Sequence, residues 1–321
     1  MNPEPIAGAG GSAGSVPRRV AVTGARGFIG RHLVARLQAR GDEVVTVSVR
    51  APCEDARLAD VFRRAEIVVN LAGVVAAVRE ADYVAGNVDA ARAIARAARD
   101  AGARLVHISS LAAAGPAPPA APRGEDDPPA PITTYGRTKL DGERIVSATA
   151  GLRWTILRPG VVYGPRDRAL LPLFRYAARG FLPLVGNPAA AYTFVYIDDM
   201  IRAIEAAINR DAEGEVVFVG HATPVSLAAL LDRIRALTGG AARIVHVPPA
   251  LARAAAAAGD LSGALTGRPA PINSRRYAEA MSEGFVCRVD RLRDRLGVVA
   301  GIDLAEGLTR TADWYRREGC L

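Results

Sequence analysis

A glycine-rich turn between an apolar strand and a helix is the feature that most constrains how this chain can fold. Residues 18–23 form an apolar run with several β-branched side chains, and residues 28–40 have helical spacing. Between them, Gly24 permits a tight turn, Gly27 lets the backbone approach a pyrophosphate, and Gly30 allows close packing of the helix on the strand. The N-terminus of such a helix presents free N–H groups to phosphate. The arrangement predicts a dinucleotide-binding site.

Strand and helix patterns continue to alternate after this turn. The expected strands are residues 43–49, 67–71, 105–109 and 154–157, and the expected helices are residues 55–64, 82–100 and 134–148. Continuous apolar strands separated by helices are typical of a parallel sheet that is covered on both faces. The sequence therefore predicts an α/β fold with a Rossmann-type doubly wound parallel sheet.

The regular alternation of strands and helices ends near residue 170, and short expected strands are then mixed with several expected helices. This predicts a smaller C-terminal α+β substrate lobe beside the sheet. We expect residues 1–17 to be a flexible tail, residues 18–165 to be the NAD(P)-binding core, and residues 166–321 to be mainly the substrate-binding lobe, with some segments returning to the core. Residues 115–131 contain seven prolines. Because the strand–helix pattern resumes directly after them, we expect a lid or loop inside one domain rather than a linker.

The composition excludes several classes of protein. Of the 321 residues, 50% are hydrophobic and 23% are charged, as in a globular protein and unlike a disordered chain. The net charge of +8 is spread thinly, and no basic block or zinc-finger spacing is present, so nucleic acid is not an expected partner. Three cysteines without a CxxC pair and four histidines without ligand spacing argue against a disulfide framework and against a metal site.

The sequence also gives no sign of a membrane or secretion segment. Residues 1–17 are rich in Gly, Ala, Ser and Pro and lack the apolar centre of a signal peptide. The longest apolar run, residues 67–78, is too short to span a bilayer. We therefore expect no transmembrane segment and a cytoplasmic protein.

Tyr135 and Lys139 stand four residues apart at the start of an expected helix and share one of its faces. Lys139 is the single lysine among 41 basic residues. A nearby ammonium stabilises a phenolate, so we expect it to lower the pKa of Tyr135 and to let this side chain act as an acid or base. Ser109 and Ser110 end the fourth expected strand, where parallel sheets gather ligands, and can orient a carbonyl or alcohol oxygen toward Tyr135.

Taken with these residues, the motifs TGARGFIG, NLAG, HISS, YGRTK and LRPGVVYGP resemble the extended short-chain dehydrogenase/reductase superfamily. This group contains NAD-dependent epimerases and dehydratases, 3β-hydroxysteroid dehydrogenases and dihydroflavonol reductases. The resemblance runs from about residue 18 to the C-terminus. It implies an enzyme with an NADP or NAD cofactor and a small-molecule substrate. Helices at residues 88–100 and 135–148 resemble the pair that forms a four-helix dimer interface in this group, which implies a homodimer.

The resemblance also implies roles for individual residues. Tyr135 resembles the acid/base, Lys139 the lysine that holds the nicotinamide ribose, and Ser110 the catalytic Ser/Thr, while Asn87 resembles the family's helix asparagine. Asp60 and Val61 resemble an adenine-contacting pair, and residues 71–73 resemble the segment that runs past the cofactor. The full set of expected cofactor-binding residues is Gly24, Arg26, Gly27, Phe28, Ile29, Ser48, Arg50, Asp60, Val61, Leu71, Ala72, Gly73, Tyr135, Lys139 and Pro159.

The choice of cofactor is predicted from the end of the second strand. NAD-binding sites usually carry Asp or Glu there, whereas this chain has Ser48 followed two residues later by Arg50. Arg26 lies in the glycine turn as well. Guanidinium groups suit a 2′-phosphate, which favours NADP. The alternative interpretation is that both arginines are ordinary surface residues of an Arg-rich chain.

Three functions remain open from the sequence. Sugar-nucleotide members usually read RPFNVYGP, whereas this chain reads RPGVVYGP with Val161 at the Asn position, and it has residues 192–194 in place of their RDF. These departures favour an oxidoreductase that interconverts a secondary alcohol and a ketone, as in the steroid-like and flavonoid-like branches. The alternative is an epimerase or dehydratase that acts on a nucleotide sugar with a retained cofactor. A non-catalytic redox sensor is disfavoured because Tyr135 and Lys139 are both present.

Overall fold

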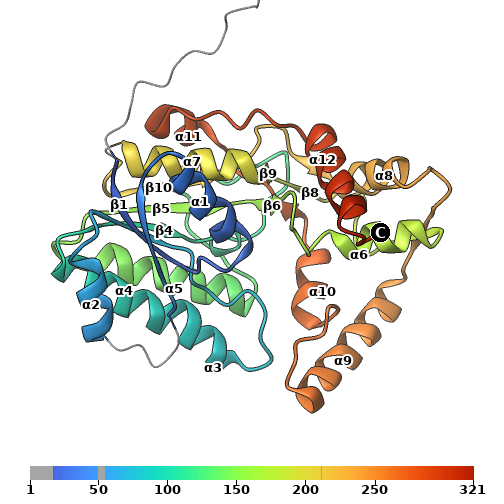
Figure 1. Ribbon diagram of the computed structural model, residues 1–321. Coiled ribbons are helices and arrows are strands. Elements are labelled where there is room, and N and C mark those ends of the chain that lie inside the picture. Colours follow the sequence, from blue (N-terminus) through green and yellow to red (C-terminus); the bar gives the residue numbers. More distant parts are fainter. Residues whose placement is uncertain (1–16, 50–54, 211) are drawn as a thin grey trace, which may run out of the picture.

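Six parallel strands form the central sheet of the computed structural model, which describes residues 17–49, 55–210 and 212–321 (Figure 1). Their order is β2-β1-β3-β4-β5-β10, so the chain starts one strand from an edge, adds β2 on one side of β1 and then adds the other strands on the opposite side. The strands are β1 (Arg19–Thr23), β2 (Glu43–Val47), β3 (Ile67–Asn70), β4 (Arg104–Ile108), β5 (Trp154–Pro159) and β10 (Glu215–Val219). All the pairings in this sheet are parallel, as the apolar strands predicted.

Helices cover both faces of this sheet (Figure 1). One face carries α1 (Phe28–Ala39), α7 (Ile197–Asn209) and α11 (Asp290–Leu296), and the other carries α2 (Asp55–Phe62), α4 (Ala90–Asp100) and α5 (Thr134–Ala148). Each strand buries alternate side chains in two cores. Val20 and Val22 pack toward α1 and α7, whereas Ala21 between them packs toward α2, α4 and α5.

The helix expected at residues 82–100 is divided into three parts. It consists of α3 (Glu80–Tyr83), a π-helical turn (Val84–Asp89) and α4. The π turn contains Asn87, whose side chain reaches back to the loop after β3. A widened turn of this kind changes the direction of a side chain without ending the helix, and periodicity alone does not reveal it.

The remaining elements form the smaller C-terminal part. Its strands are β6 (Val161–Tyr163), β7 (Phe181–Leu184), β8 (Ala191–Tyr192), β9 (Phe194–Tyr196), β11 (Val225–Ser226), β12 (Arg243–His246) and β13 (Gly284–Phe285). Its helices are α6 (Leu171–Ala178), α8 (Leu227–Leu237), α9 (Pro249–Thr266), α10 (Ser274–Ala280) and α12 (Leu304–Arg317). The predicted α/β fold with a smaller C-terminal lobe is confirmed. Two elements that follow residue 165, β10 and α7, belong to the main sheet and its cover.

The proline-rich segment, residues 115–131, packs along the chain that enters and leaves β13. The Ala117 N–H donates to the Gly284 carbonyl at 3.0 Å, and the Arg123 N–H donates to the Val286 carbonyl at 2.9 Å. The Glu125 carboxylate accepts from the Phe218 N–H at 3.1 Å. The segment is therefore a docked loop that joins the sheet to the C-terminal part. In the described part of the chain, no helix is both long enough and apolar enough to cross a membrane.

Candidate active site

The glycine turn leaves no room for side chains at its two closest contacts. Gly24 has φ +66°, and a Cβ atom there would lie 2.6 Å from the Leu71 carbonyl carbon. A Cβ atom at Gly30 would lie 2.3 Å from the Gly24 carbonyl oxygen, while the Gly27 N–H donates to that same oxygen at 2.9 Å. Gly27 is also the N-cap of α1 and supplies no side-chain cap. The turn fits a dinucleotide, because its backbone is open to a pyrophosphate at a helix N-terminus.

A buried chain of hydrogen bonds holds the next strand end beside this turn. The Thr23 hydroxyl donates to Asn70 Oδ1 at 2.7 Å, and Asn70 Nδ2 lies 2.9 Å from His107 Nδ1. The Ala72 N–H donates to both Thr23 Oγ1 and Asn70 Oδ1, at 3.2 and 3.1 Å. These bonds fix the segment that contains Leu71 and Ala72. The sequence analysis gave no role to Thr23, Asn70 or His107, although Asn70 and His107 lie within the NLAG and HISS motifs.

Burial keeps the His107 imidazole neutral. Its pKa is lowered well below the usual value, first by desolvation and second by the positive charge of Lys139. Among the described residues, its Nε2 atom has no hydrogen-bond partner. His107 therefore acts here as a neutral partner for Asn70.

Lys139 is buried at the C-terminal end of β4. Its side chain is only 4% exposed, and Nζ donates to the Ile108 carbonyl at 2.7 Å. Burial lowers the pKa of the ammonium to about 8, and the nearby Glu143 carboxylate opposes this shift. A Cβ atom at Gly73 would lie 3.6 Å from Nζ, so the glycine leaves space beside the lysine.

Tyr135 lies in the first turn of α5, which begins at a side-chain cap. The Thr133 hydroxyl accepts from the Gly136 N–H at 3.1 Å. The Tyr135 side chain lies close enough to Ser110 for the serine hydroxyl to lower the pKa of the phenol, and Ser110 Oγ accepts from the Ala112 N–H at 3.2 Å. Two of the three predicted catalytic residues, Ser110 and Tyr135, thus lie near each other, and Lys139 follows one helical turn later.

The expected depression of the Tyr135 pKa is not found in this structure. Burial raises the pKa of the phenol, and the nearby Ser110 hydroxyl only partly opposes the shift. Glu279 raises this pKa further, whereas Arg276 lowers it. The physical reason is that desolvation of the phenolate is the largest effect, while the Lys139 ammonium is bonded to a backbone carbonyl.

The two serines at the end of β4 face different partners. Ser109 is buried, and its hydroxyl donates to the Glu143 carboxylate. Glu143 in turn forms a buried ion pair with Arg158 of β5, with Nη2 and Oε2 2.6 Å apart. Only Ser110 therefore faces Tyr135. Sequence reasoning missed Glu143 and Arg158, although an arginine inside an apolar strand signals a buried partner.

Asn87 clamps the loop after β3 to α5. Its Oδ1 accepts from the Val74 N–H at 2.8 Å, and its Nδ2 donates to the Val74 carbonyl and to Thr138 Oγ1, both at 3.0 Å. Thr138 is the residue before Lys139. The clamp therefore holds the segment after Gly73 against the helix that carries Tyr135 and Lys139.

The other predicted cofactor residues lie along the same edge of the sheet. Phe28 and Ile29 are the partly buried first residues of α1, and Pro159 is the buried last residue of β5. Arg26 is exposed in the glycine turn, and Ser48 is exposed directly after β2. Arg50 lies outside the described residues.

The structure does not bring Asp60 and Val61 to this edge. Both lie in the second half of α2, which runs from the carboxyl ends of the strands back toward their amino ends. The Asp60 side chain is 73% exposed and is paired with Arg63. The assignment of this pair to adenine contact is therefore corrected, because the direction of the crossover helix carries both residues away from the glycine turn.

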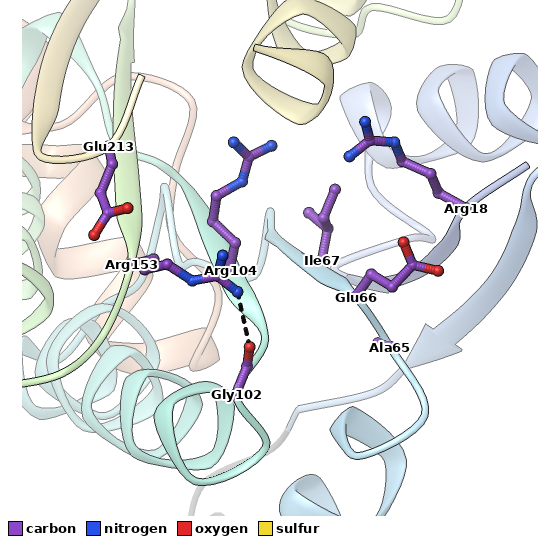
Figure 2. Close-up of a pocket in the computed structure, with 8 residues that line it drawn as sticks. All are labelled: Arg18, Ala65, Glu66, Ile67, Gly102, Arg104, Arg153 and Glu213. Atoms are coloured by element: carbon purple, nitrogen blue, oxygen red, sulfur yellow. Dashed lines mark hydrogen bonds between the residues drawn. The ribbon is translucent and has the colours of Figure 1, made fainter. Parts of the chain in front are cut away.

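A concave region lies at the opposite edge of the sheet (Figure 2). It is lined by the amino ends of the strands and includes Arg18, Arg104 and Arg153. These guanidinium groups bond backbone carbonyls: Arg104 and Arg18 reach the C-terminal end of α7, and Arg153 donates to Gly102 at 3.0 Å (Figure 2). The region holds helix and loop ends together and is not a candidate catalytic site. Within the described residues, no group of His, Cys, Asp and Glu could hold a metal ion.

Comparison with known proteins decides the family. The family model described as NAD dependent epimerase/dehydratase family matches residues 20–220. The chain belongs to this family. It is accordingly an enzyme of the NAD(P)-dependent extended short-chain dehydrogenase/reductase group, with a nucleotide cofactor and a small-molecule substrate.

Relatives within the family have different activities. A ceramide reductase of Caulobacter vibrioides is 29% identical and aligns with 94% of this chain and 96% of its own length. A dTDP-6-deoxy-L-talose 4-dehydrogenase (NAD(P)(+)) of Kitasatospora kifunensis is 31% identical over 73% of this chain and 83% of its own length. The solved structure of MoeE5 with UDP-glucuronic acid and NAD is 27% identical, with a TM-score of 0.74 and coverage of 94% and 99% of the two chains.

Proposed function

We propose that this enzyme interconverts a secondary alcohol and a ketone, with NADP as its preferred cofactor. The observation that carries the proposal is the contact of 2.7 Å between the buried Lys139 ammonium and the Ile108 carbonyl, which holds the helix that carries Tyr135 against the strand end that carries Ser110. Ser110 orients the substrate oxygen by a hydrogen bond, and Tyr135 gives or takes its proton. The bound nicotinamide supplies or accepts the hydride.

The residues proposed to hold the cofactor surround this contact. The glycine turn would bind the pyrophosphate through backbone N–H groups, and Lys139 would bind ribose hydroxyls beside Gly73. Arg26 and Arg50 are proposed to attract the 2′-phosphate. The exposed position of Arg26 supports this, since its guanidinium is accessible at the turn.

An apolar ketone is the proposed substrate class. Val161 replaces the asparagine of the sugar-nucleotide pattern, and its side chain packs against the larger core cluster. An aliphatic side chain offers a diphosphate no hydrogen bond. The ceramide reductase aligns with nearly the whole chain, and its name supports a branch that reduces lipid-like ketones.

The experiment first compares the binding of NADPH and NADH, measured as quenching of the protein's fluorescence. It then screens ketones for turnover with the preferred cofactor. Tyr135→Phe is expected to abolish turnover while leaving cofactor binding intact, and Tyr176→Phe in α6 is the matched control. Wild-type turnover by Tyr135→Phe on an identified substrate would show the mechanism to be wrong.

The alternative function is that of an epimerase or dehydratase with a retained cofactor. The observation in its favour is the likeness to MoeE5, which was solved with UDP-glucuronic acid and NAD. Purified protein that carries tightly held NAD and shows no net reduction would support this alternative. Failure of the protein to bind any UDP- or GDP-sugar would exclude an epimerase or dehydratase that acts on nucleotide sugars.

Three further proposals concern the whole chain. We propose a homodimer through α4 and α5, to be tested by sedimentation equilibrium, and a cytoplasmic location, to be tested by fractionation. We also propose that residues 18–165 bind the cofactor and that residues 166–321 mainly bind the substrate. Of the tail expected at residues 1–17, residues 1–16 lie outside the described residues. Chimaeras in which residues 166–321 are replaced by those of a relative would test this division. They should acquire the substrate preference of that relative.

A further inference from the structure

Arg166 has a backbone conformation that few residues with side chains adopt. It is the one non-glycine residue with a positive φ, +74°, in the part of the chain that the structure describes. It stands third in a tight turn that starts at Gly164, and the Asp167 N–H closes this turn by donating to the Gly164 carbonyl at 3.0 Å. Proline in second place and a left-handed residue in third place make a type II turn, whose third place favours glycine or asparagine. The arginine therefore carries a steric cost that glycine would avoid.

The neighbouring contacts impose this conformation without using the arginine side chain. The Asp167 carboxylate accepts from the Ala169 and Leu170 N–H groups at 2.7 and 3.1 Å. The backbone carbonyl of Asp167 accepts from the buried Tyr315 hydroxyl at 2.9 Å. Arg166 itself is exposed, and its guanidinium has no hydrogen-bond or ion-pair partner within the described residues. Strain at a residue whose side chain adds nothing to the fold points to a role in binding.

Two contacts place the turn beside the first turn of α1. The Pro165 carbonyl oxygen lies 3.0 Å from His32 Nε2. The His32 side chain points back toward the N-terminus of its helix, since its ring meets the Phe28 ring edge-on with centroids 5.6 Å apart. The carbonyl that precedes Arg166 therefore lies next to the turn of α1 that follows its N-cap, Gly27. This is the helix end that the glycine turn offers to a pyrophosphate.

The electrostatics of this helix end leave a place for a full positive charge. The first turn of α1 contains no acidic residue, and its N-cap supplies no side chain. Arg31 Nε donates to the Arg26 carbonyl at 2.9 Å, so that guanidinium is bonded to the glycine turn itself. Backbone N–H groups and the helix dipole supply partial charges, whereas a guanidinium supplies a full charge and paired donors that match phosphate oxygens. An extended arginine side chain spans more than one helical turn of about 5.4 Å, so Arg166 can reach this end.

We propose that Arg166 binds the pyrophosphate of the dinucleotide cofactor, together with the N-terminus of α1. The inference goes beyond the proposed ketone–alcohol function, because NAD and NADP carry the same pyrophosphate. Arg166 holds the cofactor and takes no part in proton transfer. Glycine would fit the turn with less strain but would lose this contact, which accounts for an arginine at a position that favours glycine.

The test measures nucleotide binding by the full-length protein. Arg166→Gly removes the guanidinium and relieves the strain, so it should unfold at the wild-type temperature or up to about 3 °C above it. It should bind NADPH, NADH and ADP-ribose each about 10-fold more weakly in calorimetry, because all three contain the pyrophosphate. Arg166→Lys keeps the charge and should lose no more than about 3-fold. The matched control is Arg168→Ala, which removes an exposed charge two residues away and should change each affinity by less than about 2-fold.

The other outcomes overturn the proposal in distinguishable ways. Unchanged affinity of Arg166→Gly for all three nucleotides shows that the guanidinium does not bind the cofactor, even if the KM for a substrate rises. A loss confined to NADPH places the guanidinium at the 2′-phosphate, and an equal loss in Arg168→Ala shows a general effect of positive charge. Failure of the wild-type protein to bind any of the three overturns both this contact and the assignment of the glycine turn.

Discussion

The Lys139 ammonium donates a hydrogen bond to the Ile108 carbonyl, with Nζ and O 2.7 Å apart. Ile108 ends β4, and Ser109 and Ser110 follow it directly. The bond therefore ties the helix that carries Tyr135 to the strand end that carries the serines. A compact ammonium can make this bond and still offer two further N–H donors, whereas a planar guanidinium is larger and has a fixed fork of donors.

Lys139→Arg is expected to lose roughly 100-fold in kcat/KM while the protein stays folded. The guanidinium retains the charge, but its planar fork of donors replaces the compact ammonium that bonds the Ile108 carbonyl at 2.7 Å beside Gly73. Steady-state kinetics measures the loss of kcat/KM, and thermal unfolding checks that the variant stays folded. Arg137→Lys, an exposed exchange on the same helix, is the control and should leave both unchanged. Near-normal turnover by Lys139→Arg would refute the role of the ammonium.

The buried lysine also makes stability depend on pH in a defined window. Its pKa is about 8 in the folded protein and 10.5 in the unfolded chain, so the unfolded chain binds more protons between these values. The free energy of unfolding contributed by Lys139 should rise with pH there, by up to about 1.4 kcal/mol per pH unit. Denaturant unfolding of the wild type and of Lys139→Met, from pH 7.5 to 10.5, isolates this contribution. A difference between the two proteins that stays flat across the window would contradict it.

The sequence predicted the sheet because buried parallel strands must be apolar and the helices between them amphipathic. It also predicted that Ser110, Tyr135 and Lys139 converge, since the carboxyl ends of parallel strands lie at one edge and residues four apart share a helix face. Both rules are local or follow from topology. They do not depend on the packing of individual side chains.

The parts that could not be predicted depend on such packing. Which of Ser109 and Ser110 faces Tyr135 depends on the position of Glu143, and that carboxylate is fixed by Arg158 on another strand. Asp60 was misassigned because a motif gives the distance along the chain but not the direction in which a crossover helix runs. The widened turn at residues 84–89 is likewise invisible in a pattern of apolar residues.

Gly24→Ala is expected to weaken both folding and nucleotide binding. The new Cβ atom would lie 2.6 Å from the backbone of Leu71 and would occupy a left-handed conformation at φ +66°. Gly41→Ala is the matched control, since Gly41 has φ +90° but nothing within 4 Å of the new atom. We expect the control to cost about 1 kcal/mol of unfolding free energy and Gly24→Ala to cost more, roughly 3 kcal/mol. Equal costs, with unchanged NADPH quenching, would show that the turn is not tightly packed against Leu71.

The buried pair of Glu143 and Arg158 gives the last prediction. Glu143→Gln or Arg158→Met alone should lower the free energy of unfolding by about 3–5 kcal/mol, because each leaves the other charge buried without its partner. The double variant should cost much less than the sum of the two, which a double-mutant cycle in urea measures. The exposed pair of Asp141 and Arg144 on the same helix, 3.1 Å apart, is the control and should show a coupling below about 1 kcal/mol. A coupling in the buried cycle no larger than in the exposed one would mean that Glu143 is not held by Arg158, and Ser109 would then lose the acceptor that turns it away from Tyr135.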